Sequence, residues 1–398
     1  MRGLIRFAVV GMALLGMLPT CCIHASDPHE DQTNAALLYY QAFMRLEGLS
    51  SEENQIFLSP MEEGIDFEKT EGLVKKYRES IRVAEIASMM PKCNFAFVPI
   101  EENNYAWRPY QVIRRLGQLV MFEARLCISR KEYQRAFDLS VTLRRFARQL
   151  NDRSNIMSVN MGRIVEQYSL DCLKALAEAG QHDQKILHSI RDLLLEDDAA
   201  QTYSYVKHLG AYRDYIIRNC PTDEEFRAKV EADRFLSRDL DREPLRTAMA
   251  LRGEESVHYR IGAYIDYINS TVEIFKKGQS SLGIYNQMES LRIPYVDPNQ
   301  YQLDFYGNVS GDICVHYLGY LKFVSYYNIV KNGVDIYLII QKNGEVPQRL
   351  PKGLAIDPCT GKDLSYRLCA NGFALGYDAR QFHPNIDVGI CETVFEVH

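Results

Sequence analysis

The stretch of residues 133–150, YQRAFDLSVTLRRFARQL, decides the fold of this chain. Its apolar residues recur at steps of three and four positions, which is the spacing of one face of an α-helix. The stretches 113–127 and 157–176 on either side show the same spacing. Short turns around residues 129–131 and 151–152 separate the three stretches. Because short connections make helices antiparallel neighbours, we predict three helices that pack side by side.

Helical spacing extends from this centre in both directions. Before it lie the patterns at residues 35–46 and 67–90, and after it a series of patterns runs from 186 to 291. The sequence is helical-repeat-like, but the intervals differ in length and no fixed period emerges. We therefore predict an irregular antiparallel helical array over residues 26–300.

The region after the array begins with a predicted loop and a long helix. Residues 301–311 have the composition of a loop, and an apolar-faced helical pattern follows over 312–342. The pair Asn343-Gly344 terminates this helix, since glycine adopts the left-handed conformation that ends helices.

Strand-like alternation follows the long helix. Apolar and polar residues alternate over 364–369, 373–377 and 388–397, as they do in half-buried strands. The pair Asn371-Gly372 lies between the first two segments and is a strong signal for a two-residue hairpin turn. The predicted fold is mainly α, with a small β-hairpin or three-stranded sheet packed on the long helix over residues 312–398.

The first residues have the layout of a secretory signal. Arg2 and Arg6 form a cationic head, and the apolar run 7–18 is shorter than the roughly 20 residues that span a bilayer. We predict a signal peptide over residues 1–25 and an exported protein, periplasmic or extracellular, with a single membrane anchor as the alternative.

A second processing route is lipidation. The segment Leu18-Pro19-Thr20-Cys21 loosely matches a lipoprotein box, although Pro19 and Thr20 fit it poorly. Membrane association is therefore expected only if Cys21 or Cys22 carries a lipid.

Composition limits the class of partner. The chain has 398 residues, of which 46% are hydrophobic and 25% charged, as in ordinary soluble domains. Its net charge of −6 argues against a nucleic-acid partner, because counterion release requires a basic face.

The positions of the cysteines predict which of them form a disulfide and which remain free thiols. Two of the ten cysteines lie within the signal, and the others show no CxxC or zinc-ribbon spacing. Cys359, Cys369 and Cys391 lie close together near the end of the chain and are the candidates for a disulfide. Cys127 and Cys172 fall on apolar helix faces, so we expect them to be buried free thiols.

Three segments carry a family resemblance: NAALLYY at residues 34–40, NGEVP at 343–347 and DPCTGKDLSYR at 357–367. The chain resembles exported helical proteins of unknown function from planctomycete-type bacteria. Its ending is also similar, more distantly, to the globular tip of type II secretion pseudopilins, without their processed membrane helix or calcium-binding acids. The resemblance implies a location and a fold but no reaction.

The resemblance also implies structural roles for residues of the C-terminal hairpin. Pro358 and Gly361 belong to the family's turn, and Asn371 and Gly372 lie at the hairpin. Cys359 stands where the family has an aromatic residue, which suggests that a disulfide takes over its packing role.

No catalytic or metal-binding motif is present. The region 353–363 differs from a phosphate loop in spacing, and Asp363 would repel phosphate. His182 and His188 are six residues apart and would lie on different faces of a helix. We therefore predict no cofactor and no metal site.

The remaining compositional signal is aromatic: 25 tyrosines against one tryptophan. Tyr212 with Tyr215 and Tyr264 with Tyr267 are spaced three apart, and they are candidates for an aromatic groove, with ordinary helix packing as the simpler alternative. We predict an exported non-catalytic interaction or scaffold protein with a protein or glycan partner in the cell envelope. The alternative is an envelope hydrolase for a glycan or peptide, whose acids converge only in the fold.

Overall fold

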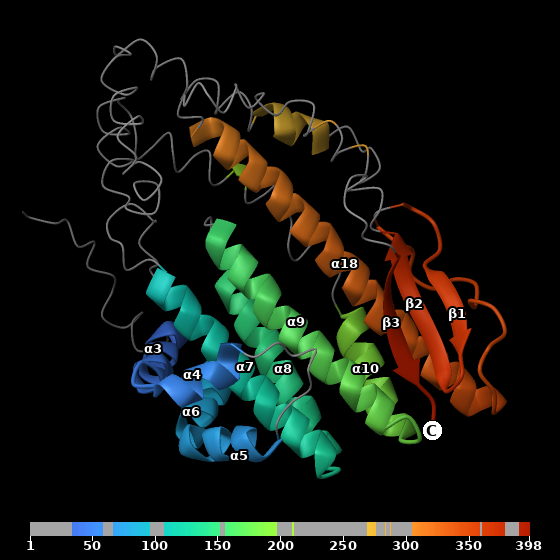
Figure 1. Cartoon of the computed structure of the whole chain (residues 1–398), viewed down its shortest axis with the longest axis horizontal. Helices are drawn as coiled ribbons and strands as arrows, with labels where there is room; N and C mark the ends of the chain where they lie inside the picture. Colours follow the sequence, from blue (N-terminus) through green and yellow to red (C-terminus); the bar gives the residue numbers. More distant parts are fainter. Residues whose placement is uncertain are drawn as a thin grey trace, which may run out of the picture. The chain divides into compact units, whose positions relative to one another are not determined.

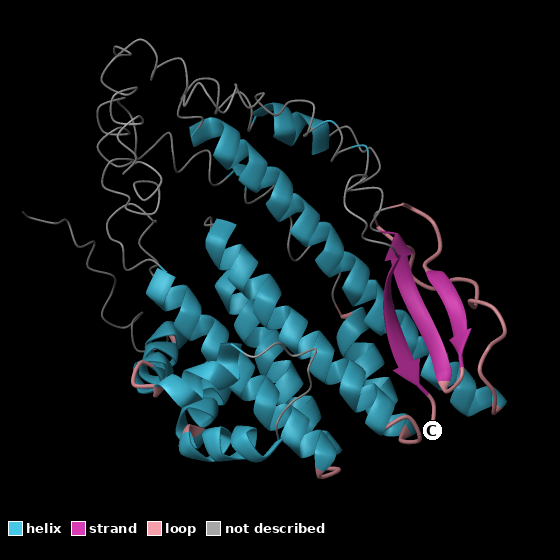
Figure 2. Ribbon diagram, in the orientation of Figure 1, coloured by secondary structure: helices cyan, strands magenta, loops and turns pink. Residues whose placement is uncertain are grey.

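The structure is a computed structural model, and the residues that it describes belong mostly to helices (Figures 1 and 2). From Ala35 to His398 they lie within one compact unit. The predicted signal peptide lies outside the described residues. These cover the following ranges: 34–58, 67–95, 107–151, 156–196, 209–210, 269–275, 283, 287, 305–358, 360–378 and 390–398.

The mainly helical fold class is confirmed, and the first helices refine it. The elements here are α3 (Ala35–Leu46), α4 (Ser51–Leu58), α5 (Phe67–Lys76) and α6 (Arg78–Ser88). The single helical pattern over residues 67–90 is therefore two helices, because the chain leaves helical geometry at Tyr77, where φ is −103° and ψ is 19°.

The helix α4 was not predicted, although the sequence contains its start signal. The Ser50 N–H donates to Glu53 Oε2 at 2.8 Å, and the Glu53 N–H donates to Ser50 Oγ at 3.1 Å. This reciprocal pair is a capping box, which satisfies two backbone donors at the start of a helix.

The three central helices are present and contact one another, as predicted. They are α7 (Trp107–Ser129), α8 (Tyr133–Asn151) and α9 (Ile156–Ala179). The Tyr133 hydroxyl donates to the Ala179 carbonyl at 2.9 Å, so the start of α8 lies beside the end of α9. That contact makes the pair antiparallel. The helix α10 (Gln184–Leu195) follows, and the Asp183 side chain caps it by accepting from the Ile186 N–H.

The long helix α18 (Phe305–Asn343) contacts α9 and α10. It begins seven residues earlier than predicted, so the predicted loop over residues 301–311 is wrong from Phe305 onward. The predicted end is confirmed: Gly344 has φ of +78°, and its N–H donates to the Ile340 carbonyl at 2.7 Å.

The sheet has three antiparallel strands in the order β1-β2-β3: β1 (Ser365–Cys369), β2 (Gly372–Asp378) and β3 (Ile390–Glu396). Cys369 pairs with Gly372, so the two loop residues of the hairpin are Ala370 and Asn371. The predicted turn is thus displaced by one residue. Gly372 opens β2 with φ of +143°, a conformation that side chains rarely adopt.

Aromatic side chains join the sheet to α18. The rings of Phe373 and Phe395 stack with centroids 5.1 Å apart, and Tyr337 meets both rings edge-on. A side chain at Gly333 of α18 would overlap the Phe395 ring, so glycine lets the sheet approach the helix closely. The predicted packing of the sheet on the long helix is confirmed.

Candidate functional site

Two consecutive tyrosines connect α18 to the helical array. The Tyr326 hydroxyl donates to Oδ1 of Asp171 on α9 at 2.6 Å. The Tyr327 hydroxyl donates to the Leu194 carbonyl of α10 and accepts from Arg144 Nη2 of α8, both at 2.8 Å. Successive residues of a helix diverge by about 100°, so each tyrosine reaches a different side of α18. We call the two contacts the Tyr326 clamp and the Tyr327 clamp.

The Tyr327 clamp includes a buried ion pair. Arg144 Nη1 lies 3.2 Å from Glu166 Oε1, and the two side chains are 2% and 3% exposed. Arg144 also lies over the Tyr327 ring, 5.4 Å from its centroid. Burial raises the pKa of Tyr327, and the positive charge of Arg144 opposes that rise. The Arg144 guanidinium group thus joins α8, α9 and α18, and the Tyr327 hydroxyl adds α10.

The Tyr326 clamp places a carboxylate beside a neutral hydroxyl. Burial raises the pKa of Asp171, and the Tyr326 hydrogen bond and the charges of Arg125 and Lys174 lower it only in part. Burial also raises the pKa of Tyr326, which keeps its hydroxyl protonated as the donor. A partly buried acid with a raised pKa, such as Asp171, occurs at functional sites and also in structural networks.

Two acids from different helices converge at a third place, as the hydrolase alternative requires. Arg135 Nη2 lies 3.0 Å from Glu85 Oε2 of α6 and 3.2 Å from Glu123 Oε1 of α7. The guanidinium group of Arg135 binds both carboxylates. Glu85 and Glu123 in turn raise the pKa of Arg135. The geometry is that of a partly buried ionic cross-link.

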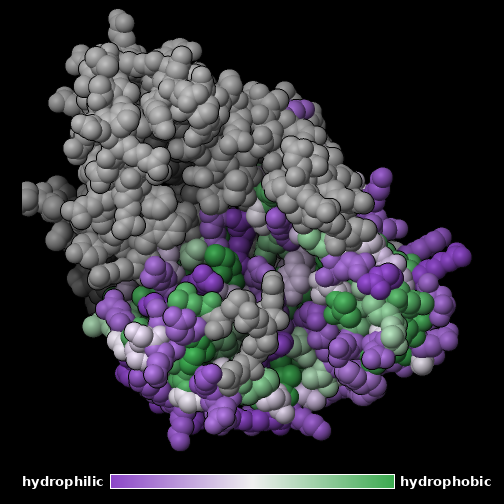
Figure 3. All heavy atoms as spheres, in the orientation of Figure 1, coloured by the Kyte–Doolittle hydropathy of each residue, from purple (hydrophilic) through white to green (hydrophobic). Residues whose placement is uncertain are grey.

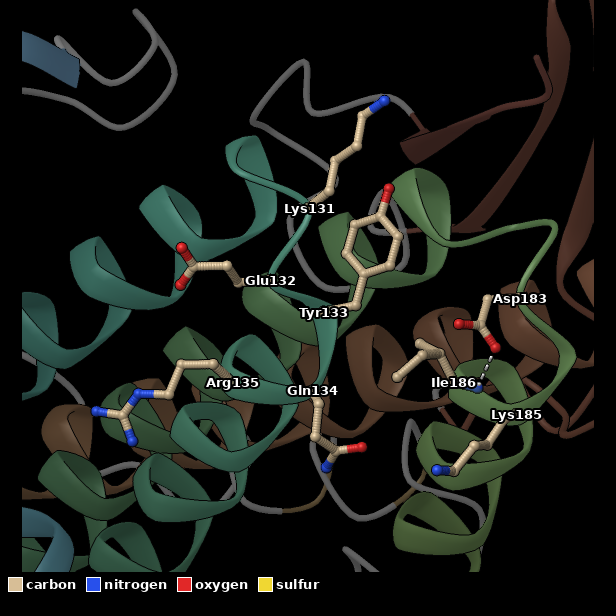
Figure 4. Close-up of a pocket in the computed structure, with 8 residues that line it drawn as sticks. All are labelled: Lys131, Glu132, Tyr133, Gln134, Arg135, Asp183, Lys185 and Ile186. Atoms are coloured by element: carbon tan, nitrogen blue, oxygen red, sulfur yellow. Dashed lines mark hydrogen bonds between the residues drawn. The ribbon is translucent and has the colours of Figure 1, made fainter.

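A shallow depression of about 500 Å³ lies between the start of α8 and the start of α10 (Figure 4). Its side chains point in different directions. Asp183 turns back to the Ile186 N–H, and Arg135 points away from α10. The lining side chains therefore do not converge on one point at which a ligand could bind. The lining residues are Lys131, Glu132, Tyr133, Gln134, Arg135, Asp183, Lys185 and Ile186.

Cys127 and Cys172 are buried free thiols, as predicted. Burial raises the pKa of each to about 12, which keeps both protonated and unreactive near neutral pH. Cys369 and Cys391 are also free. They cannot pair with each other, because Cys369 lies opposite Gly372 at one end of β2 and Cys391 lies opposite Tyr377 near the other. A disulfide to Cys359, which lies outside the described residues, stays a prediction.

The other predicted residues of the C-terminal hairpin lie in turns. Pro358 belongs to a turn in which the Gly361 N–H donates to the Asp357 carbonyl at 2.8 Å. Gly361 has φ of +67°, which favours glycine. The Asn371 carbonyl accepts from the Val397 N–H at 2.9 Å, so the hairpin loop also holds the end of β3.

The candidate aromatic groove is not part of the described residues: Tyr212, Tyr215, Tyr264 and Tyr267 all lie outside them. Within the described ranges, no group of three or more His, Cys, Asp or Glu side chains could hold a metal ion. In the same ranges, no helix combines the length and the apolar character needed to cross a membrane.

Sequence reasoning missed the clamp residues. In the sequence, Arg144 and Glu166 each stand directly beside a residue of an apolar stripe, Leu143 and Val165, both of which the structure buries fully. Charged residues at the edge of an apolar stripe are usually solvated, so the pattern alone does not separate a surface charge from a buried pair. The partner on α18 is more than 150 residues away in sequence.

Comparison with known proteins gives no relative: no family model, no curated protein and no solved structure matches this chain. The resemblance to exported planctomycete-type proteins and to pseudopilin tips therefore stays a prediction.

Proposed function

We propose that this protein is an exported, non-catalytic interaction or scaffold protein of the cell envelope, and that its partner is a protein. The observation that carries the proposal is a row of exposed apolar side chains on α3. Leu37 and Met44 are 50% and 73% exposed, and Tyr40 is 37% exposed. The spacing of three and four residues puts all of them on one face of the helix.

The opposite face of α3 is fully buried, so this helix is already anchored in the fold. Ala35, Tyr39 and Ala42 are 0% exposed, and α3 contacts α6 and α7. Figure 3 shows hydrophobic surface among hydrophilic surface in the region of α3 to α6. Apolar rows at helical spacing are the usual docking face for another helix.

Two acids of α9 support the same proposal, since each of them binds another part of the fold. Glu166 pairs with Arg144, and Asp171 accepts from Tyr326. These contacts connect the helices of the array with one another and with α18, as a scaffold requires. The proposed location in the envelope rests on the predicted signal peptide and on the family resemblance.

Site-specific crosslinking tests the proposal. A photoreactive amino acid replaces Gln41, an exposed residue on α3 beside the row, and the full chain is crosslinked in producing cells. We expect a discrete adduct in the envelope fraction, which the double variant Leu37→Glu/Met44→Glu loses. The control Leu195→Glu adds the same charge at an exposed apolar residue of α10 and retains the adduct. An adduct that persists in the double variant contradicts the proposed surface.

An envelope hydrolase is the second candidate, and the convergence of Glu85 and Glu123 is the observation that favours it. Turnover of a panel of glycans and peptides by the purified protein is the test. If activity is present, Glu123→Gln should abolish it and Glu79→Gln, an exposed acid of α6, should not. Activity that survives Glu123→Gln excludes this pair as the catalytic acids.

A further inference from the structure

The exposed face of α3 carries no charge. From Asn34 to Met44 the sequence contains no Asp, Glu, Lys or Arg. The exposed side chains of this stretch are Leu37, Tyr40, Gln41 and Met44. The Tyr40 hydroxyl is already engaged, since it donates to the Phe95 carbonyl. The face therefore presents apolar surface and one amide, and it has no charge with which an ionic partner could pair.

The exposed side chains of α3 are spaced symmetrically. Tyr40 and Gln41 are adjacent, and Leu37 and Met44 each lie three residues further out. In an antiparallel pair of α3 helices centred between Tyr40 and Gln41, Leu37 lies opposite Met44 of the second copy, and Tyr40 lies opposite its Gln41. The same contacts recur in reverse, as a two-fold interface requires. The face is thus complementary to itself.

The charges that follow the row fit the same arrangement. Arg45 and Glu47 are exposed and have opposite signs. In the antiparallel pair, these residues of the two copies lie at opposite ends of the contact, so like charges do not meet across it. Glu47 also lies near the beginning of the other α3, where the helix dipole favours a negative charge.

The contact requires no change in the fold. The other face of α3 is already buried, and the helix lies at the margin of the helical array in Figure 1. Its 12 residues extend over about 18 Å. Two helices of this length bury less than the roughly 800 Å² per partner of a standard interface, so the association should be weak.

We infer that the partner of the apolar row on α3 is a second copy of this chain, bound through an antiparallel α3–α3 contact. The inference rests on the proposed function and deepens it, because it names the protein that the row binds. The interface is isologous, so each copy uses its one row and the assembly closes as a dimer.

Sedimentation velocity of the purified full chain tests this inference. We expect the fraction of dimer to rise between about 10 and about 500 μM, since an interface below the standard size is weak. A chain that stays monomeric over this range overturns the inference.

Two double variants test the antiparallel register. Leu37→Glu/Met44→Glu places like charges opposite each other and should raise the dissociation constant at least about 100-fold. Leu37→Glu/Met44→Lys places opposite charges face to face, so its dissociation constant should stay within about tenfold of the wild-type value. A parallel pair would bring like charges together in both variants. Equal weakening by the two variants therefore overturns the inference.

A matched control separates the row from the effect of added charge. Leu58→Glu/Leu195→Glu introduces two carboxylates at exposed apolar residues outside α3. Its dissociation constant should equal that of wild type. If this control weakens the dimer as much as Leu37→Glu/Met44→Glu does, the contact does not lie on α3 and the inference is wrong.

The crosslinked adduct from Gln41 distinguishes this inference from the proposed function. An adduct of twice the mass of the chain, in which mass spectrometry identifies two α3 peptides, supports both. An adduct with a different protein supports the proposed function and overturns the pairing of two copies.

Discussion

Both tyrosine clamps connect α18 to the helical array, but the tyrosine of one contacts a positively charged group and the tyrosine of the other a carboxyl group. Tyr327 binds a guanidinium group that is paired with Glu166, whereas Tyr326 binds the carboxylate of Asp171. The first clamp keeps its charge at every physiological pH, because arginine does not lose its proton. The second changes charge with pH. Adjacent positions on one helix can thus carry a permanent contact and a titratable one.

The largest expected effect comes from removing the charge partner of Arg144. Glu166→Gln leaves the guanidinium group buried beside a neutral amide. Because a broken buried pair leaves a desolvated charge, we expect a loss of about 3–5 kcal/mol in the free energy of unfolding. Urea unfolding followed by circular dichroism measures it. The double variant Arg144→Met/Glu166→Leu removes both charges and should recover part of the loss; no recovery contradicts the expected cause.

Tyr327→Phe should have the next largest effect. The change withdraws a hydroxyl that Arg144 donates to and that itself donates to the Leu194 carbonyl. Two buried polar groups lose a partner, so we expect a loss of about 1–3 kcal/mol. The same unfolding assay measures it, and a loss no larger than that of Tyr326→Phe would contradict the ranking of the clamps.

Tyr326→Phe should lower the free energy of unfolding by less, about 1 kcal/mol near neutral pH. The variant removes one hydrogen bond, from the Tyr326 hydroxyl to Asp171. The carboxylate that loses this donor can be neutralised by protonation. The cost should therefore shrink as the pH falls and the carboxyl becomes neutral. Unfolding curves at a series of pH values check this, and a cost that grows toward acidic pH would contradict it.

Asp171→Asn should have the smallest effect and the opposite sign. The amide oxygen still accepts from Tyr326, and the penalty for burying an ionised carboxylate disappears. We expect the variant to match wild type or exceed its stability by up to about 1 kcal/mol at neutral pH. Below the ordinary pKa of aspartate the difference should vanish. Thermal unfolding at neutral and acidic pH measures both values, and a clear loss at neutral pH would show that the charge is stabilising.

The helices were largely predictable because apolar periodicity is a local property. The patterns at residues 35–46 and around 133–150 match α3 and α8, since each stripe must be buried against a neighbour. The errors lie at boundaries. The break at Tyr77 and the early start of α18 depend on packing that spacing alone does not encode. The capping box at Ser50 and Glu53 was a local signal and could have revealed α4.

The clamps lie beyond sequence reasoning for a different reason. The burial and hydrogen bonds of the clamp residues depend on partners on other helices: Asp171 pairs with Tyr326, and Arg144 with Tyr327. Arg144 and Tyr327 are 183 residues apart in the sequence. A carboxyl group has an ordinary pKa until the fold removes its water. No pattern within α9 distinguishes Asp171 from a solvated aspartate.

By itself the sequence determined the mainly helical class, the antiparallel centre and the C-terminal hairpin, because these follow from local periodicity and turn residues. Only the tertiary structure decided which polar residues are buried, which acids meet, and how α18 is held. The physical reason is that burial and charge pairing are non-local: they depend on distances between residues that the chain brings together only when it folds.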